Sequence, residues 1–201
     1  MMRKTPLWLL CLTLFPGSAL AQRIQNSDVF WLFGASTVKQ QTIDGSGATV
    51  KGATGLAIEY GYGYQIVRQS AASLWIEFAP QFGGADSVHT SLPSVVNLSW
   101  SAYPLGLRFM VPLAARVSVY AAGGGGAGSF HAVQFVPGTS PAVTSNAVWH
   151  GIFDFGGGVD IRLNRRLSIR AEVRDLVSGT GLSGAAGRNH LIPAGGLALH
   201  F

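Results

Sequence analysis

The chain has 201 residues, of which 48% are hydrophobic and only 11% are charged, with a formal net charge of +5. An ordinary soluble domain has about 25% charged residues, so a chain this poor in charge needs an unusual packing or an unusual solvent. The length is enough for one domain with one substantial core.

The first 21 residues have the pattern of a cleaved secretory signal. A basic start precedes an apolar run over residues 7–15, and Ala19 and Ala21 form the small-x-small pattern of a signal peptidase site. We expect cleavage after Ala21, which leaves residues 22–201 as a single exported domain. A short membrane anchor is the weaker alternative, because a spanning helix needs roughly 20 apolar residues.

Export limits the chemistry that the mature chain can carry. Cys11 is the only cysteine and lies inside the signal, so no disulfide and no thiol for catalysis or metal binding remains. Removal of Arg3 and Lys4 lowers the net charge from +5 to about +3. The basic balance is therefore a poor argument for nucleic acid, and we expect no nucleic-acid partner and no cofactor.

The mature sequence favours β-strands, since no segment after the signal has a convincing 3.6-residue period. We predict eight strands, over residues 28–36, 56–67, 74–82, 99–111, 117–130, 150–163, 167–176 and 190–201. The gaps between them alternate between long and short, and the long ones are rich in Gly, Ser, Thr and Pro. This pattern is typical of an all-β, eight-stranded antiparallel up-and-down transmembrane β-barrel.

The predicted strands other than 28–36 and 117–130 each have one large apolar face and one face of Gly, Ala and a few charges. In residues 167–176, Leu167, Ile169 and Val173 share one face, while Arg170 and Glu172 share the other. The second face is too small and too charged to enclose a hydrophobic core, so a soluble barrel is excluded. We expect the large face to contact lipid, with barrel closure leaving no unpaired backbone in the bilayer.

The charged residues of the small face are then expected inside the barrel. They comprise five acids and four bases: Glu59, Glu77, Arg108, Asp154, Asp160, Arg162, Arg170, Glu172 and Arg174. Charges in a narrow lumen are tolerated only when paired, so we predict a network of salt bridges and hydrogen bonds that fills the barrel. Eight strands leave just enough room for side chains, and we expect no open pore.

Aromatic residues occur where membrane–water girdles are expected. The set is Trp31, Tyr60, Tyr64, Trp75, Trp100, Tyr103 and Trp149. The register of strand 28–36 stays open. So does that of strand 117–130, in which Gly123–Gly126 carries little information about faces.

From residue 28 to residue 201 the chain resembles the small outer-membrane β-barrel proteins of the OmpA, OmpX and opacity type. The resemblance depends on the signal, on the hairpin "GGGVDIRLNRRLSIRAEVRDL", and on the last strand "AGGLALHF" with Leu197, Leu199 and Phe201 at alternate positions. It implies outer-membrane localisation, contact with lipid and lipopolysaccharide, and a C-terminal signature that the barrel assembly machinery reads. Pro193 interrupts the last strand and must sit where the ladder needs no N–H.

The resemblance implies a structural or surface-interaction role through four extracellular loops, whose partners the sequence does not identify. A narrow channel for small solutes and a lipid A-modifying enzyme are the alternatives. The enzyme would need a Ser/His/acid set drawn from Glu77, Asp86, His89, Ser91, His131, His150 and Asp154. Their spacing does not place them within hydrogen-bond reach, and no spacing suggests a metal site.

Two further motifs have simpler explanations. Gly123, Gly125 and Gly128 match G-x-G-x-x-G, but a dinucleotide site needs a following helix and none is expected here. Arg165 and Arg166 occupy a predicted periplasmic turn, where a solvated turn is the favoured interpretation over a partner site.

Overall fold

The computed structural model describes residues 25–38, 41–42, 49–52, 54–90, 95–135, 143–144, 147–178 and 189–201, and their regular structure is all β. The strands are β1 (Ser27–Val38), β2 (Gln41–Thr42), β3 (Thr49–Gly52), β4 (Thr54–Arg68), β5 (Ser73–Phe78), β6 (Gln81–Thr90), β7 (Val95–Ala114), β8 (Val117–Phe135), β9 (Val143–Thr144), β10 (Val148–Arg162), β11 (Leu167–Ser178) and β12 (Asn189–His200). Within these ranges, no helix has the length and hydropathy needed to cross a membrane.

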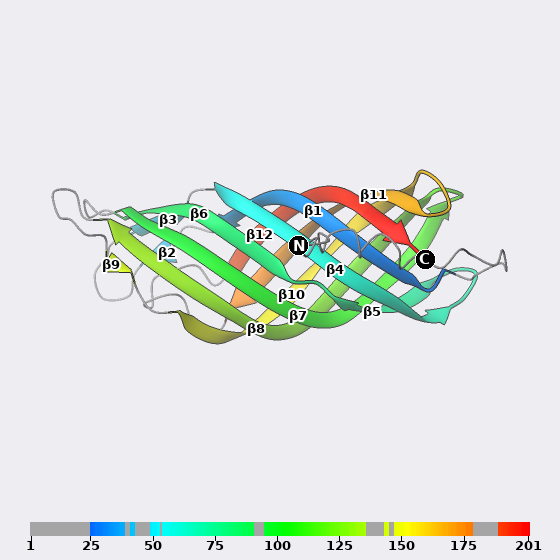
Figure 1. Ribbon diagram of the computed structural model, residues 1–201, viewed down its shortest axis with the longest axis horizontal. Helices are drawn as coiled ribbons and strands as arrows, with labels where there is room; N and C mark the ends of the chain where they lie inside the picture. Colours follow the sequence, from blue (N-terminus) through cyan, green and yellow to red (C-terminus); the bar gives the residue numbers. More distant parts are fainter. Residues whose placement is uncertain are drawn as a thin grey trace, which may run out of the picture.

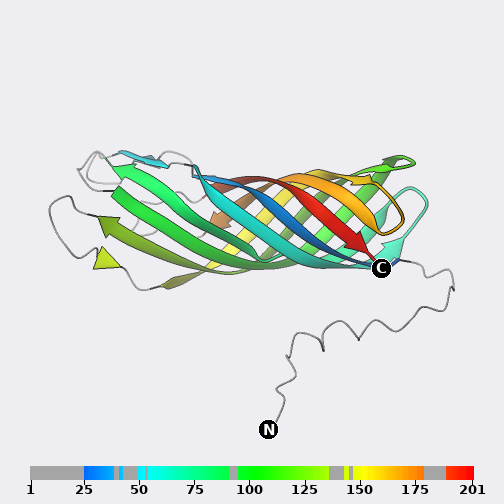
Figure 2. The same ribbon diagram turned by 45° about the horizontal axis from the view of Figure 1, so that its top comes forward.

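The long strands form a closed antiparallel ring (Figures 1 and 2). The ring runs β1, β4, β5 with β6, β7, β8, β10, β11 and β12, and β12 pairs with β1 to close it at Trp31↔Leu197. Because β5 and β6 both pair with β4 and β7, they are two parts of one span. The predicted eight-stranded up-and-down barrel is thus confirmed, with β2, β3 and β9 as short additions to its edges.

The break between β5 and β6 falls at Ala79–Pro80. The Ala79 N–H donates to the Pro104 carbonyl at 3.2 Å, and the Pro80 carbonyl accepts from the Tyr60 N–H at 3.1 Å. Both neighbouring strands therefore stay bonded across the break. Proline lacks a backbone N–H, so such an interruption is expected where it enters a strand.

The two ends of the barrel differ. Short turns join β4 to β5, β7 to β8 and β10 to β11 at one end, where the C-terminus also lies (Figure 2). We call this the turn end and the opposite one the loop end. The β10–β11 turn is fastened by the Asn164 Oδ1, which accepts from the N–H groups of Arg166 and Leu167 at 2.8 and 2.9 Å.

Pro193 lies within β12 and not at its edge. The ladder to β11 runs through Val173↔Pro193 without interruption. The ladder to β1 passes from Gly34↔Ala194 to Thr37↔Leu191 and skips the proline. The missing N–H is thus accommodated on the β1 side, as the sequence requires.

Side chains alternate between the two faces as the sequence predicts. Leu107 and Phe109 on β7 are 49% and 50% exposed, whereas Arg108 between them is 0% exposed. On β12, Leu197 is 48% exposed. The apolar bulk of the described strands therefore faces outward and the charges face inward, the reverse of a water-soluble core.

The girdle prediction is wrong at two positions. Trp31, Tyr60, Tyr64 and Trp149 are exposed on the outer face, and Tyr103 is half-exposed. Trp75 and Trp100 are buried inside the barrel. The reason is strand phase, because Trp75 alternates in step with the inward Glu77, and Trp100 with the inward Arg108.

Candidate functional site

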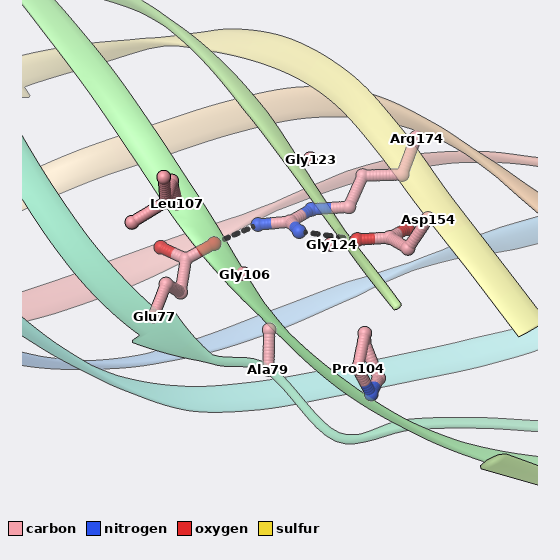
Figure 3. A pocket seen from close by; sticks show the side chains of 9 residues that line it. All are labelled: Glu77, Ala79, Pro104, Gly106, Leu107, Gly123, Gly124, Asp154 and Arg174. Atoms are coloured by element: carbon pink, nitrogen blue, oxygen red, sulfur yellow. Dashed lines mark hydrogen bonds and ion pairs between the residues drawn. The ribbon is translucent and has the colours of Figure 1, made fainter. Parts of the chain in front are cut away.

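The interior of the barrel is the candidate site, and Arg174 on β11 is the centre of its charge network. Its guanidinium contacts Glu77 at 2.5 Å and Asp154 at 2.7 Å, the two pairs drawn in Figure 3. It also contacts Glu172 at 2.7 Å and Glu59 at 3.3 Å. The four carboxylates come from β4, β5, β10 and β11, so one arginine ties together strands from opposite sides of the ring.

A second centre is Asp28 on β1, which accepts from two arginines. Arg108 Nη2 lies 2.6 Å and Arg170 Nη2 lies 2.8 Å from Asp28 Oδ2. Arg108 also contacts Glu77 at 2.7 Å, and Arg170 contacts Asp160 at 3.1 Å. Through the shared Glu77, the two centres form one continuous network.

Sequence reasoning missed Asp28. The strand "DVFWLFGAS" has large apolar residues on both faces, so alternation alone assigns no inward side. The structure puts Asp28, Phe30 and Leu32 inside, fully buried. The available signal was Asp28 itself, because a carboxylate within a membrane span belongs on the lumen side.

Aromatic rings line the network. The Cζ of Arg108 lies 4.9 Å from the Trp75 ring centroid, and the Cζ of Arg170 lies 4.7 Å from that of Phe30. Tyr120 on β8 lies 5.7 and 5.5 Å from the same two guanidiniums, and its hydroxyl donates to Glu172 at 2.5 Å. These contacts place Arg108 and Arg170 against the negative faces of aromatic rings, which favours the burial of both cations.

Neutral polar groups extend the network toward the turn end. Ser168 Oγ donates to Asp160 at 3.0 Å and lies 2.8 Å from His200 Nε2. His200, the last residue of β12, is buried at 3% exposure. On the other side, Gln81 Nε2 donates to Asp154 at 3.2 Å.

Toward the loop end the interior becomes aromatic. His190 on β12 lies 5.6 Å from Trp100 and 6.0 Å from Phe130, measured between ring centroids, and Phe130 lies 6.0 Å from His150. We call Trp100, Phe130 and His190 the aromatic plug. Gly83 provides its space, since a Cβ there would lie 2.2 Å from the Trp100 ring. The sequence did not predict this plug, because Trp100 was assigned to the outer girdle.

Small inward residues make room for the network, as expected from the sequence. A Cβ on Gly63 would lie 2.6 Å from Asp28 Oδ1 and 2.8 Å from Arg108 Nη2. A Cβ on Gly158 would meet the Tyr120 hydroxyl at 2.6 Å. The glycines thus act as sockets for the long side chains of neighbouring strands.

The space left beside Arg174 is minimal (Figure 3). A cavity of about 10 Å³ is lined by Glu77, Ala79, Pro104, Gly106, Leu107, Gly123, Gly124, Asp154 and Arg174. That volume holds about one water molecule at most. At this level the lumen is filled by side chains.

The charges inside the barrel are less balanced than the sequence predicts. Eight of the nine residues expected in the lumen are buried, and Asp28 joins them. Arg162 is the exception, since it is half-exposed at the turn end and its Nη1 donates to Gln25 Oε1 and the Arg165 carbonyl, both at 3.3 Å. Among the described residues, six buried carboxylates therefore face three buried guanidiniums.

Two of the sequence candidates for an enzymatic set belong to the charge network. Glu77 and Asp154 both bind Arg174. Ser91, the side chains of Asp86 and His89, and the signal residues Ala19 and Ala21 lie outside the described residues. In the described part of the chain, no group of His, Cys, Asp and Glu could hold a metal ion.

Two motifs have clear positions in the barrel. Gly123, Gly125 and Gly128 all lie within β8, so they form no phosphate-binding turn. Leu197, Leu199 and Phe201 face outward and are 48%, 41% and 53% exposed. The C-terminal signature thus occupies the apolar outer face.

The comparisons with known proteins agree with this architecture. Residues 7–192 match the family described as outer membrane protein beta-barrel domain. No curated protein sequence matches the chain.

Several solved structures share the fold at low sequence identity. OprG, an outer membrane protein of Pseudomonas aeruginosa, superposes with a TM-score of 0.55 at 12% identity, over 88% of this chain and 96% of that one. Neisserial surface protein A gives 0.53 at 11% identity, over 87% and 97%. A major outer membrane protein of Thermus thermophilus gives 0.53 at 11% identity, over 86% and 99%. At such identities the likeness concerns the fold alone.

Proposed function

Because the chain belongs to the outer membrane protein beta-barrel domain family, we propose that it is a sealed barrel of the outer membrane whose loops make contacts at the cell surface. The observation that carries this proposal is the filled interior. Arg108 and Arg170 are fully buried, and about 10 Å³ remains beside Arg174. A barrel that conducts solutes needs a continuous wet path, which this packing opposes.

The orientation follows from family anatomy. Barrels of this class have short periplasmic turns and longer extracellular loops, so we assign the turn end to the periplasm. The sequence between the long strands at the other end is rich in Gly, Ser, Thr and Pro and would form the surface-exposed loops. Lipopolysaccharide and other cell-surface components are the proposed contacts of these loops.

Delivery to the membrane forms part of the same proposal. Residues 1–21 would direct export and be removed after Ala21. The barrel assembly machinery would then read Leu197, Leu199 and Phe201. Their outward position on the last strand supports this role, because a binding partner can reach them before the ring closes.

Conductance in a planar bilayer tests the sealed barrel. We expect no steady channels from the folded protein, and channels of defined size would show that the lumen is a solute path. Mass spectrometry of lipid A from cells with and without the protein tests the enzymatic alternative. We expect an unchanged lipid A profile, whereas a new acylation state would replace the structural role with a catalytic one.

A further inference from the structure

Among the residues that the structure describes, five arginines surround the turn end of the barrel, and we call them the turn-end arginine ring. Arg68 ends β4, Arg116 lies in the β7–β8 turn, and the β10–β11 turn and its start carry Arg162, Arg165 and Arg166. All are exposed except Arg162, which is half-exposed. The three hairpins occupy successive positions around the barrel (Figure 2), so the charges form a ring and not a single patch.

Within the described part of the chain, no Asp or Glu side chain forms an ion pair with Arg68, Arg116, Arg165 or Arg166. The carboxylates of β1, β4, β5, β10 and β11 that lie near it in sequence are buried in the lumen. Asp175 lies toward the loop end, where Asn189 donates to it at 3.0 Å. Arg68, Arg116, Arg165 and Arg166 make no ion pair with any described residue, so their guanidiniums are available to an external anion.

The ring lies directly beside the lipid-facing surface. Val67 precedes Arg68 and is 43% exposed, Leu113 near Arg116 is 65% exposed, and Leu163 near Arg165 is 45% exposed. Strands rise about 3.3 Å per residue, so Arg68, Arg116 and Arg165 each lie within about 10 Å of an exposed apolar residue along the chain. Long arginine side chains at such positions extend to the level of the lipid headgroups.

We propose that the turn-end arginine ring binds the phosphate groups of anionic phospholipids in the leaflet at that end. Guanidinium groups bind phosphate through paired N–H donors, and clustered arginines beside a membrane attract anionic lipid. Lipid is favoured over a soluble acidic partner because the arginines are distributed around the circumference, as annular lipids are. The identification of this leaflet as the periplasmic one rests on the orientation proposed above. The binding itself does not depend on that orientation.

The test compares two variants of equal net charge. The turn-end variant, Arg68→Gln/Arg116→Gln/Arg165→Gln, removes one arginine from each hairpin. The loop-end variant, Lys39→Gln/Lys51→Gln/Arg188→Gln, removes the cations that follow β1, lie within β3 and precede β12 in the sequence. Each protein is folded in a non-ionic detergent, and its folded state is checked by heat-modifiable migration on a gel. Native mass spectrometry then follows the binding of phosphatidylglycerol and of phosphatidylcholine with identical acyl chains.

The wild-type barrel is expected to prefer phosphatidylglycerol. Because the three replaced arginines lie on different hairpins, each lipid site loses one cation, and the apparent affinity should fall about fivefold in the turn-end variant. The loop-end variant should bind like the wild type, and phosphatidylcholine binding should be equal in all three proteins.

Three results would overturn the proposal. One is equal binding of the two lipids by the wild type, and another is an equal loss of phosphatidylglycerol binding in both variants. The third is polyglutamate displacing phosphatidylglycerol from the wild type as effectively as free phosphatidylglycerol does, which would identify the ring as a site for soluble acids. None of these results depends on conductance or on the loops, so the sealed-barrel proposal stands or falls separately.

Discussion

At the residue scale, the buried charges are tolerable because each has partners on other strands. Arg174 alone contacts four carboxylates, and Arg108 and Arg170 share Asp28. Moving an ion out of water costs several kcal/mol, which only good geometry with several partners offsets. The same charges also set register, since a slip of one residue would turn Arg108 or Arg170 into lipid.

Asp28 should be the most sensitive carboxylate of the network. Asp28→Asn removes the carboxylate that Arg108 and Arg170 share, so that Arg108 keeps only Glu77 and Arg170 only Asp160 as ion-pair partners. We expect the free energy of unfolding in urea, measured with the barrel in lipid vesicles, to fall by about 3–5 kcal/mol.

Glu59→Gln is the matched control for Asp28→Asn. Glu59 makes the longest of the four ion pairs to Arg174, at 3.3 Å, and the lumen already has more carboxylates than guanidiniums. Removing one negative charge should relieve like-charge repulsion, so the free energy of unfolding should stay equal or rise. A loss as large as that of Asp28→Asn would show that the network needs every carboxylate ionised.

At the element scale, period-two alternation explains both what the sequence predicts and what it does not. Glu77, Arg108 and Arg174 mark the inward face of their strands, and the structure follows them. The strand 28–36 is apolar on both faces and β8 is nearly all Gly and Ala through its centre, so neither shows its phase. Asp28 and Tyr120 were therefore missed, and contacts between distant strands, such as the aromatic plug, leave no local signal in a single sequence.

The glycines of β8 differ according to the face they occupy. A Cβ on Gly124 would lie 2.6 Å from the Leu105 carbonyl oxygen and 2.8 Å from the Gly106 Cα. We expect Gly124→Ala to lower the free energy of unfolding by about 1–3 kcal/mol, because backbone must move to admit the methyl group. Urea unfolding monitored by tryptophan fluorescence would measure the loss.

The neighbouring glycine serves as the control. The nearest atom to a Cβ on Gly123 is the Asp154 carbonyl oxygen at 3.6 Å, an ordinary contact. Gly123→Ala should therefore be neutral or stabilise the strand by about 0.5–1 kcal/mol. If both substitutions cost the same, close packing between β7 and β8 is not what requires glycine at residue 124.

The last strand should matter more for assembly than for stability. Phe201 is 53% exposed, and its backbone N–H and carbonyl bond to Ser27 whatever its side chain. We expect Phe201→Ala to lower the amount of folded protein in the outer membrane of cells several-fold. Phe155→Ala removes a similar lipid-facing ring, 43% exposed, and should leave that amount unchanged.

The purified proteins separate the two effects. After refolding into vesicles, both variants should lose a similar, small free energy of unfolding. The reason is that Phe201 and Phe155 each present a phenylalanine ring on the outer face of the wild-type barrel. Equal levels of Phe201→Ala and Phe155→Ala in cells would remove the assembly role of the C-terminal residue.

At the scale of the whole molecule, two different barriers lie in series along the barrel axis. The aromatic plug occupies the loop end, and the ionic network around Arg174 and Asp28 fills the interior below it. Outside, the apolar belt contacts lipid and the turn-end arginine ring borders it. The plug fills the lumen with packed aromatic rings, whereas the network fills it with ion pairs that also link strands across the ring.

This arrangement predicts that removing the plug does not open the barrel. Trp100→Ala should create a pocket at the loop end beside Gly83, where the indole now packs against the bare backbone. The network beneath it should stay intact, because its ion pairs are centred on Arg174 and Asp28. We therefore expect Trp100→Ala to lower the free energy of unfolding by about 3–5 kcal/mol while planar-bilayer recordings stay silent, like those of the wild type. Steady channels in Trp100→Ala alone would mean that the aromatic plug is the true seal and that ions pass the network freely.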